Sequence, residues 1–425
     1  MIAWLLISFF VLLFLGVPIA MSLGLSAMGG ILFLGGGSTV TIAQRMFEGM
    51  NSFALLAIPL YTFAGFTMSK GGISKRLMDF CYSIVGHIYG GLAHVNVLSS
   101  MIFAGISGSA VADTAGVSGM FMPEMIRKGY SKNFTVAVTA ISSTIGIIIP
   151  PSIPMVVIAG ICGISTGKLF LGGIIPGILC GLAQMIVSYF LAKKESVPKE
   201  PGHFTIGPVL HGLWESWPAL LMPIIIVGTI TMGIVSPTEA GVIAVVYGLF
   251  AGGIIYRELK WEDIKFAFAE TVRTSGRIFI VIGAAKLYTV MLTTAGFDKW
   301  VAKTMLGFST NPTVILIMIL LIFFIVTMFM ESIATLTLFM PILYPIALGV
   351  GINPIVLSVL ITVVIGIGLV TPPVGMCIYV ACDLMDTTVG EVFPTLVPFI
   401  AATFVCIALM VAFPQLILLP TYLMA

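Results

Sequence analysis

Charged residues are scarce in this chain of 425 residues. Asp, Glu, Lys and Arg make up 8% of it, against about 25% in a typical soluble domain. Hydrophobic residues make up 59%, and the mean hydropathy is +1.17. A chain of this composition would aggregate in water, so we exclude a soluble globular protein and predict an all-α membrane protein that crosses the bilayer several times.

Sequence features of several other classes of protein are also missing. The net charge of +2 comes without a basic block, so nothing points to nucleic-acid binding. The four histidines do not cluster, and the six cysteines lie in apolar segments without CxxC spacing. A zinc centre or a disulfide framework is therefore not expected. HExxH is absent, which argues against a membrane metalloprotease.

What the chain does contain is an internal repetition. Phe121-Met122-Pro123 recurs as Phe339-Met340-Pro341, and an acidic residue precedes each proline by ten positions. The other matched landmarks are Pro18 with Pro237, Pro150-Pro151 with Pro372-Pro373, and Pro176 with Pro398. All offsets lie between 218 and 222 residues. In so apolar a chain, such a duplication predicts a transporter with its binding site between two halves.

Apolar runs predict ten crossings, five in each half, because about 17 to 25 such residues span a bilayer. The first half (1–200) supplies 2–16, 18–34, 53–69, 133–163 and 170–191, and the second (201–425) supplies 218–235, 237–256, 273–292, 354–386 and 393–419. The first run lacks a basic flank, so we expect a membrane helix there rather than a cleaved signal. Segments 39–52, 73–88, 261–271 and 297–308 are polar enough to lie along the interface, with 261–271 as an arm.

Five crossings per half make the second repeat inverted relative to the first, and the basic residues support that count. With this topology, fourteen Lys and Arg fall on one side of the membrane and four on the other, while Lys286 remains inside a span. Such a bias places the richer side in the cytoplasm and both termini outside. The hydrophilic linker 193–211 divides the repeats.

Two segments resist a simple spanning assignment. Segments 91–128 and 312–349 are apolar but have small, polar middles, at 106–110 and 327–335. Each is either two ordinary crossings or one re-entrant hairpin with its tip at membrane depth. Irregular backbone at that depth is tolerated where it lines a site or is buried in protein. We favour the hairpin because each segment is followed by a helix that Pro-Pro interrupts.

The two Pro-Pro pairs carry the clearest chemical signal. Two consecutive prolines remove two amide donors and clash with the preceding turn, so the helix opens within 146–152 and 368–375. Freed carbonyls could coordinate a small cation, and the half-helix that follows presents its amides to an anion. The alternative is a mere kink. Recurrence in both halves, each time beside a hydroxyl (Ser152, Thr371), favours a site.

Each half also places one acid beside its polar hairpin middle, Asp113 and Glu331. A carboxylate inside a membrane is costly, so it is usually paired, protonated or functional. Two roles remain open: capping of the returning helix, or direct coordination of a cation. Glu239 is different, because Ser236, Pro237 and Glu239 form the pattern of a capping box at the start of a scaffold helix.

Five motifs in order resemble the large membrane subunit of tripartite ATP-independent periplasmic (TRAP) transporters. They are Leu56-Ala57-Ile58-Pro59-Leu60, Ser107-Gly108-Ser109-Ala110-Val111-Ala112-Asp113, Pro150-Pro151-Ser152, Ser236-Pro237-Thr238-Glu239-Ala240 and Thr371-Pro372-Pro373-Val374-Gly375. The resemblance runs essentially end to end. It implies a bacterial inner-membrane carrier that sodium (Na⁺) drives, together with a small four-helix membrane subunit and a periplasmic binding protein. Its substrates would be organic acid anions such as sialic acids and C4-dicarboxylates.

The resemblance also implies an elevator, in which two hairpins and two broken helices move against a scaffold. One Na⁺ would lie between the tip at 107–109 and the break at 146–152, the other between 327–332 and 368–375. The residues expected at the cations are Ser107, Gly108, Ser109, Asp113, Gly146, Pro150, Ser152, Thr327, Glu331, Ser332, Gly368, Thr371 and Gly375. Those expected at the anion are Ser107, Ser109, Pro151, Ser152, Ser332, Thr335, Pro373 and Gly375. Glu331 departs from the family, where Asp is usual, which weakens its claim to be a ligand.

Three rival functions remain to be weighed. The first is the permease of an ATP-driven importer. Its ATPase is a separate chain, so the missing Walker A motif is weak evidence against it. The inverted hairpin repeats argue against that class more strongly. A stand-alone sodium/anion carrier would have neither of the two partner proteins. An intramembrane enzyme is disfavoured because the chain shows neither a Gly-Asp signature nor a histidine cluster.

Overall fold

The computed structural model describes residues 1–34, 38–197 and 205–424 and is helical throughout, with no strand in those ranges. The first half contains α1 (Ile2–Phe14), α2 (Ile19–Leu34), α3 (Thr39–Met50), η1 (Phe53–Leu56), α4 (Ala57–Lys70), α5 (Ile73–Val85), α6 (Gly91–Ser107), α7 (Ala110–Arg127), α8 (Lys132–Ser143), η2 (Thr144–Ile147), α9 (Ile153–Cys162) and α10 (Thr166–Lys194). The second contains α11 (Ile206–Thr231), α12 (Pro237–Phe250), η3 (Ala251–Ile255), α13 (Trp261–Thr294), α14 (Phe297–Phe308), α15 (Pro312–Thr327), α16 (Ser332–Gly349), α17 (Pro354–Gly368), α18 (Met376–Asp383), α19 (Val389–Ala412), α20 (Gln415–Leu418) and η4 (Leu419–Met424).

Several of these helices are long and apolar enough to cross a bilayer. Among the described residues there are seven: Phe53–Lys70, Thr166–Lys194, Ile206–Thr231, Pro237–Ile255, Trp261–Thr294, Ser332–Gly349 and Val389–Ala412. Shorter apolar helices, α1, α2, α6, α9, α15 and α17, accompany them. The chain is therefore a polytopic, all-α membrane protein, as the composition indicates.

Three helix boundaries differ from those expected from the sequence. The arm at 261–271 and the crossing at 273–292 form one helix, α13, because no proline interrupts it and the Arg273–Glu270 ion pair (2.5 Å) spans the expected boundary. Helix α11 begins at Ile206 rather than at 218, and α19 ends at Ala412, just before Pro414. Part of the predicted linker, residues 198–204, lies outside the described residues.

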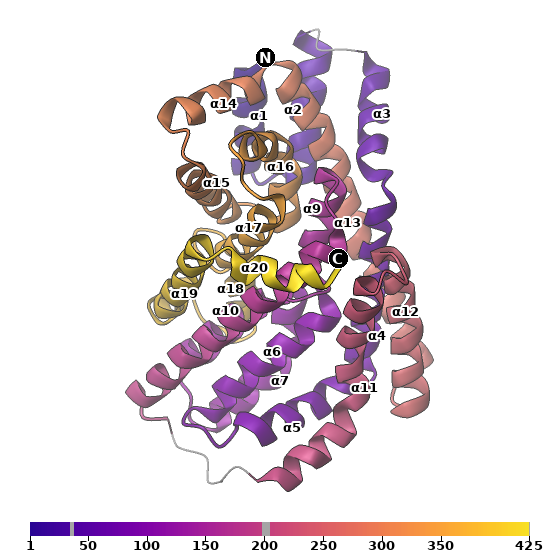
Figure 1. Cartoon of the computed structure of the whole chain (residues 1–425), viewed down its shortest axis with the longest axis vertical. Helices are drawn as coiled ribbons and strands as arrows, with labels where there is room; N and C mark the ends of the chain where they lie inside the picture. The colour runs from indigo at the N-terminus through magenta and orange to yellow at the C-terminus, as the bar shows by residue number, and fades with distance from the viewer. Residues whose placement is uncertain (35–37, 198–204, 425) are drawn as a thin grey trace.

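The long helix α13 runs beside segments that are distant in the sequence. It packs against α2, α3 and α4 from the first half and against α16 from the second. Figure 1 shows α3, α13, α4 and α12 along one flank, with α5, α6, α7 and α10 gathered below. Helices of the two halves are thus interleaved rather than placed in separate lobes.

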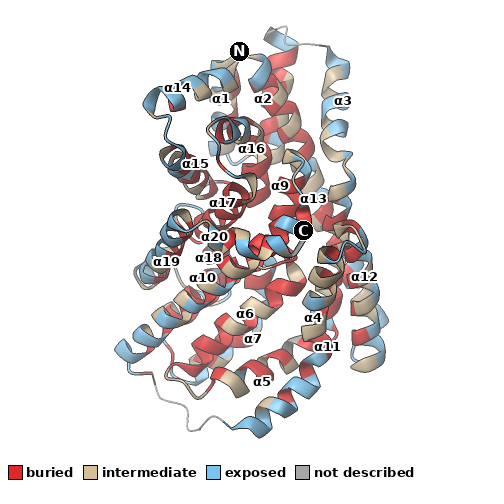
Figure 2. Cartoon of the chain, in the orientation of Figure 1, coloured by how far each residue is buried: buried red, intermediate tan, exposed pale blue. Residues whose placement is uncertain are grey.

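Burial separates an inner set of helices from an outer one (Figure 2). Residues 356–368 of α17 are all buried, because that helix is apolar on every side. In α8, residues 134–143 are buried despite several hydroxyl side chains. By contrast, α3 contains no buried residue. The broken helices therefore lie inside the protein, and α3 lies on its outside.

Hydroxyl and amide groups connect α8 to the first hairpin helix, α6. The Asn96 side chain donates to Thr139 (2.8 Å) and accepts from Ser142 (2.9 Å). Ser100 donates to Ser142 as well, at 3.0 Å. Small polar side chains of this kind let membrane helices approach closely and satisfy one another. This network holds the hairpin against the helix that carries the first Pro-Pro pair.

Candidate functional site: two hairpin tips on two broken helices

The first hairpin turns at residues 107–109. Helix α6 ends at Ser107, and Gly108 adopts φ +65°, a left-handed conformation that favours glycine. A side chain at Gly108 would also lie 2.6 Å from the Pro151 carbonyl oxygen. Ser109 then begins α7 as its N-cap. The tip is thus shaped for close contact with the Pro-Pro segment.

That contact is a backbone hydrogen bond, which the Ile153 amide donates to the Gly108 carbonyl at 3.2 Å. Around the break, α8 gives way to η2, and the Pro150–Pro151 peptide bond is cis before α9 starts. Ser152 is fully buried; its hydroxyl donates to the Ile147 carbonyl (2.5 Å) and accepts from the Met155 amide (3.3 Å). The helix therefore opens as predicted, and Ser152 spans the opening.

Asp113 lies between this tip and this break. Its side chain is 3% exposed, and the Ser107 hydroxyl donates to one carboxylate oxygen. The other oxygen, Oδ2, is buried without a hydrogen-bond partner among the described residues. It occupies the place where a Cβ on Gly146 would stand. Only glycine at 146 lets the carboxylate approach the backbone of η2 so closely.

The second tip contacts the second break in a matching way. Here the Val374 amide donates to the Met328 carbonyl at 3.1 Å, just after the cis Pro372–Pro373 bond. A Cβ on Gly368 would meet the Thr327 Cβ at 2.7 Å, so this glycine also permits close approach of hairpin and broken helix. The Thr371 hydroxyl donates back to the Ile367 carbonyl at 2.7 Å.

Glu331, however, differs from Asp113. It is the N-cap of α16, and its Oε2 accepts from the amides of Ile333 (2.9 Å) and Ala334 (3.3 Å). Its Oε1 accepts from the Ser332 hydroxyl at 2.6 Å, and the Thr335 hydroxyl donates to its carbonyl at 3.0 Å. Of the two roles left open by the sequence, the structure gives Glu331 the capping one.

The two tip-and-break units also contact each other. Helix α9, which follows the first break, packs against α16 of the second hairpin, and α18 packs against α7 and α8. Gly375 (φ +47°) is the N-cap residue of α18, so that helix has no side-chain cap. The residues expected at the cations and the anion are thus brought into one interlocked region.

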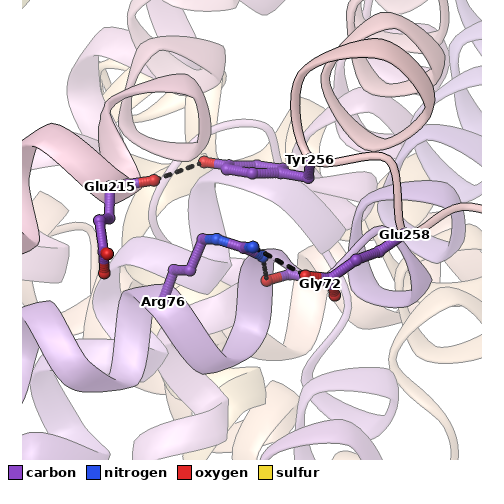
Figure 3. Close-up of polar contacts among 5 residues, drawn as sticks. All are labelled: Gly72, Arg76, Glu215, Tyr256 and Glu258. Carbon is purple, nitrogen blue, oxygen red and sulfur yellow. Dashed lines mark hydrogen bonds and ion pairs between the residues drawn. The ribbon is translucent and has the colours of Figure 1, made fainter.

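A second polar cluster, missed in the sequence, ties α5 to α11 and to the turn before α13 (Figure 3). Arg76 pairs with Glu258 (2.7 Å) and donates to the Gly72 carbonyl (2.8 Å). Its guanidinium lies over the ring of Tyr256, 4.3 Å from the centroid, and the Tyr256 hydroxyl donates to the Glu215 carbonyl (3.0 Å). Helix α5 leads into the first hairpin, so this cluster anchors the start of that hairpin to α11 and to the turn before α13.

Comparison with known proteins decides the family. Residues 6–416 match the family described as "Tripartite ATP-independent periplasmic transporter, DctM component". The chain belongs to this family. A TRAP large permease is a transport protein and not an enzyme, which removes the enzymatic rival, and the ATP-independent class removes the ATP-driven one.

Curated relatives agree with that assignment. The isethionate TRAP transporter permease protein DctMQ of Oleidesulfovibrio alaskensis is 37% identical over 92% of this chain, which spans 62% of that longer relative. The sialic acid TRAP transporter large permease protein SiaM of Vibrio cholerae is 35% identical over 96% of this chain and 95% of its own length. Among solved structures, the YdaH transporter of Alcanivorax borkumensis has a similar fold, with a TM-score of 0.60 at 13% identity, covering 87% of this chain and 86% of that one.

One motif of serine hydrolases does occur in this TRAP permease, and the structure explains it. Residues 163–167 read Gly-Ile-Ser-Thr-Gly, which has GxSxG spacing. Ser165 is the N-cap of α10 and accepts from the Lys168 amide at 3.3 Å. The serine is therefore engaged in starting a helix.

Proposed function

We propose that this TRAP permease imports an organic acid anion across the bacterial inner membrane and couples that import to a sodium gradient. The observation that carries the proposal is the buried Asp113 Oδ2, which has no partner in the described chain and faces the opened backbone beside Gly146. An unpaired charge in such a place is costly. A cation bound there would compensate it.

In the first half, the proposed Na⁺ is held between tip and break by oxygens of the kind that sodium prefers. Ser107 and Asp113 supply side-chain oxygens, and the carbonyls left without amide partners before Pro150 supply the rest. In the second half, Glu331 is occupied as a cap, so the proposed site relies on Thr371, Thr327 and the backbone of 368–375. Loss of a cation from the first site would leave the Asp113 charge uncompensated, so the stability of the tip conformation would depend on the bound ion.

Coupling follows from this arrangement. The anion is proposed to bind near the start of α18, whose N-terminus has no side-chain cap, with Ser332, Thr335, Pro373 and Gly375 around it. Sodium that orders the hairpin tips would complete the anion site, so that neither substrate moves alone. An elevator would then carry 91–163 and 312–386 against the scaffold, and the matched tip-and-break contacts support two inverted repeats as its basis.

The proposed partners are a small four-helix membrane subunit and a periplasmic binding protein, with both termini on the periplasmic side. For the anion, the sialic acid and C4-dicarboxylate class is proposed. The relatives' names include sialic acid, C4-dicarboxylate and isethionate permeases, and those substrates share an ionised acid group.

The test is uptake into proteoliposomes that contain this chain and its small partner. Labelled sialic acid, a C4-dicarboxylate and isethionate are each offered with the matching binding protein, with and without an inward sodium gradient. Uptake that requires sodium and the binding protein is the expected result. Uptake driven by a proton gradient alone would overturn the sodium sites, and uptake without the binding protein would favour a stand-alone carrier.

A further inference from the structure

A cavity whose lining includes none of the tip residues 107–109 and 327–332 lies between helices α3, η1, α9, α13 and α16. Its volume is about 300 Å³. The polar side chains that line it are Glu48, Ser52, Lys286, Thr289, Thr293 and Thr337. Lys286, Thr289 and Thr293 share one face of α13, because residues three and four apart on a helix are neighbours. A membrane helix thus presents a cation and two hydroxyl groups to a single cavity.

Lys286 lies near the Glu48 carboxylate but makes no direct ion pair among the described residues. Within the described part of the chain, its ammonium makes neither an ion pair nor a hydrogen bond, whereas Glu48 is paired with Arg45 at 2.7 Å. The hydrogen bond from Arg45, with the charges of Arg45 and Lys286, holds the pKa of Glu48 below its ordinary value, so Glu48 is ionised. Arg45, which is not among the residues that line the cavity, thus pairs with Glu48, and Lys286 is left without an ion pair among the described residues.

Thr289 gives an independent indication of a missing ligand. It is 4% exposed, and its hydroxyl has no partner among the described residues. The other two threonines of the cavity behave differently: Thr293 donates to the Val290 carbonyl (2.9 Å) and Thr337 to the Ile333 carbonyl (2.6 Å). Buried hydroxyl groups are normally hydrogen-bonded. Thr289 therefore keeps a donor free, one helical turn from the Lys286 ammonium.

Close packing fixes the lysine in this position. A Cβ on Gly49 of α3 would lie 2.6 Å from Lys286 Cβ and 3.0 Å from its Cγ. Glycine at 49 thus allows α3 to lie directly on the aliphatic stem of Lys286. The lysine stem is a built part of the α3–α13 contact rather than a loose surface chain.

We infer that this cavity is an anion site, in which Lys286 and Thr289 bind a carboxylate or sulfonate group of an organic acid. An ammonium and a hydroxyl form charge-assisted hydrogen bonds with such oxyanions. A volume near 300 Å³ is at the lower end of small-molecule sites and holds about ten waters. The rest of the lining, which includes Leu55, Val157 and Ile282, is apolar and suits a short organic chain.

The location gives the site a role, and this step rests on the proposed function. Helices α3 and α13 belong to the proposed scaffold, while α9 follows the first break and α16 belongs to the second hairpin. An anion held by Lys286 would touch the moving and the fixed parts at once. We infer that the cavity is a transient binding site for the transported anion as it reaches or leaves the tips.

Equilibrium binding tests the site without any gradient. Thermal unfolding of the detergent-solubilised permease is measured in sodium chloride, with isethionate, sialic acid or succinate added. The proteins compared are wild type, Lys286→Met, Lys286→Arg, Thr289→Val and Lys303→Met. Lys303 is exposed on α14, outside the cavity, and serves as the matched lysine control. We expect at least one anion to stabilise wild type, Lys286→Arg and Lys303→Met.

For Lys286→Met, the anion concentration that gives half the stabilisation should rise at least about tenfold, the loss typical of a charged hydrogen-bond partner. Thr289→Val, which keeps the shape of the side chain, should show a smaller rise and serves if Lys286→Met does not fold. Equal stabilisation of wild type and both variants, or no stabilisation of wild type by any of the anions, would overturn the site. Sodium-driven uptake measured on the same variants separates the two proposals. If the variants bind anions like wild type while wild-type uptake needs sodium, the anion site at Lys286 is refuted but sodium coupling is not. If anion binding needs Lys286 but uptake does not need sodium, sodium coupling is refuted but the anion site is not.

Discussion

The two hairpin tips have the same outline but treat their acids differently. Each tip accepts a backbone hydrogen bond from an amide just after a cis Pro-Pro pair, Ile153 at the first tip and Val374 at the second, and each packs over a glycine of the broken helix. At the second tip, the Glu331 carboxylate is satisfied by two amides and a hydroxyl. At the first, Ser109 begins the returning helix, which leaves one Asp113 oxygen unpartnered in the described chain.

This difference separates stability from ion binding. A carboxylate that caps a helix stabilises the fold whether or not a cation is present. A buried carboxylate oxygen without a partner costs free energy until a cation arrives. The two frames are similar, and we propose that their acids have different roles, ion binding for Asp113 and helix capping for Glu331. Each prediction below challenges that division.

The largest effect is expected from Asp113→Asn. Asparagine keeps the shape and can still accept from Ser107, but it removes the charge that faces Gly146. Sodium affinity in the uptake assay should fall about 10- to 100-fold, as for loss of a charged partner. The midpoint of thermal unfolding without sodium should be unchanged or higher, because an uncompensated buried charge is gone. Wild-type sodium dependence in Asp113→Asn would contradict the sodium site at this tip.

Alanine substitutions at Gly146 and Gly368 test the same difference between ion binding at the first tip and stability at the second. At Gly146 the added Cβ takes the place of Asp113 Oδ2, so the carboxylate must turn away and sodium affinity should fall about tenfold. At Gly368 it meets Thr327, so the tip itself must shift: the free energy of unfolding should fall by about 1–3 kcal/mol, and sodium affinity at the second site should fall with it. Sodium titration and denaturant unfolding distinguish the two. Gly116→Ala on α7 is the control, since nothing lies within 4 Å of its Cβ.

The outline of both tips could be predicted from the sequence, because prolines, glycines and N-cap serines act on their own neighbours. Pro150-Pro151 and Pro372-Pro373 open their helices wherever they are placed. The roles of the acids could not be predicted, since they depend on which atoms lie opposite. Asp113 and Gly146 are 33 residues apart in the chain, and only the packing of α7 on η2 brings them together.

The same reason explains the errors and omissions elsewhere. The arm at 261–271 was expected to end before a new crossing because its residues are polar, but the segment forms one helix with that crossing, α13, which packs against α2, α3, α4 and α16. Lys286 could be recognised from sequence as an unusual charge in a span. Its cavity could not be recognised, because the walls come from helices of both halves.

Removing the Glu331 cap should affect the fold more than the ion. Glu331→Ala leaves the first amides of α16 without their acceptor, so the free energy of unfolding should fall by about 1–2 kcal/mol. Glu331→Gln retains one oxygen for those amides and should recover most of that loss. Denaturant unfolding measures both, and sodium titration should show little change in either. A loss of sodium affinity in Glu331→Gln as large as that in Asp113→Asn would make the two acids equivalent and refute the division of roles.

The smallest effects are expected at the hydroxyl groups beside the two breaks. The Ser152 hydroxyl spans the first opening, from the Ile147 carbonyl to the Met155 amide, so Ser152→Ala should lower the free energy of unfolding by about 1 kcal/mol. Among the described residues, the Thr371 hydroxyl bonds to the Ile367 carbonyl alone, one turn earlier in the chain, so Thr371→Ala should lower the free energy of unfolding by about 0.5 kcal/mol. Sodium affinity should be more sensitive at Thr371, since at the second site Glu331 is occupied and fewer side-chain oxygens remain. The opposite ranking in both measurements would mean that the second break, rather than the first, depends on its hydroxyl to stay open.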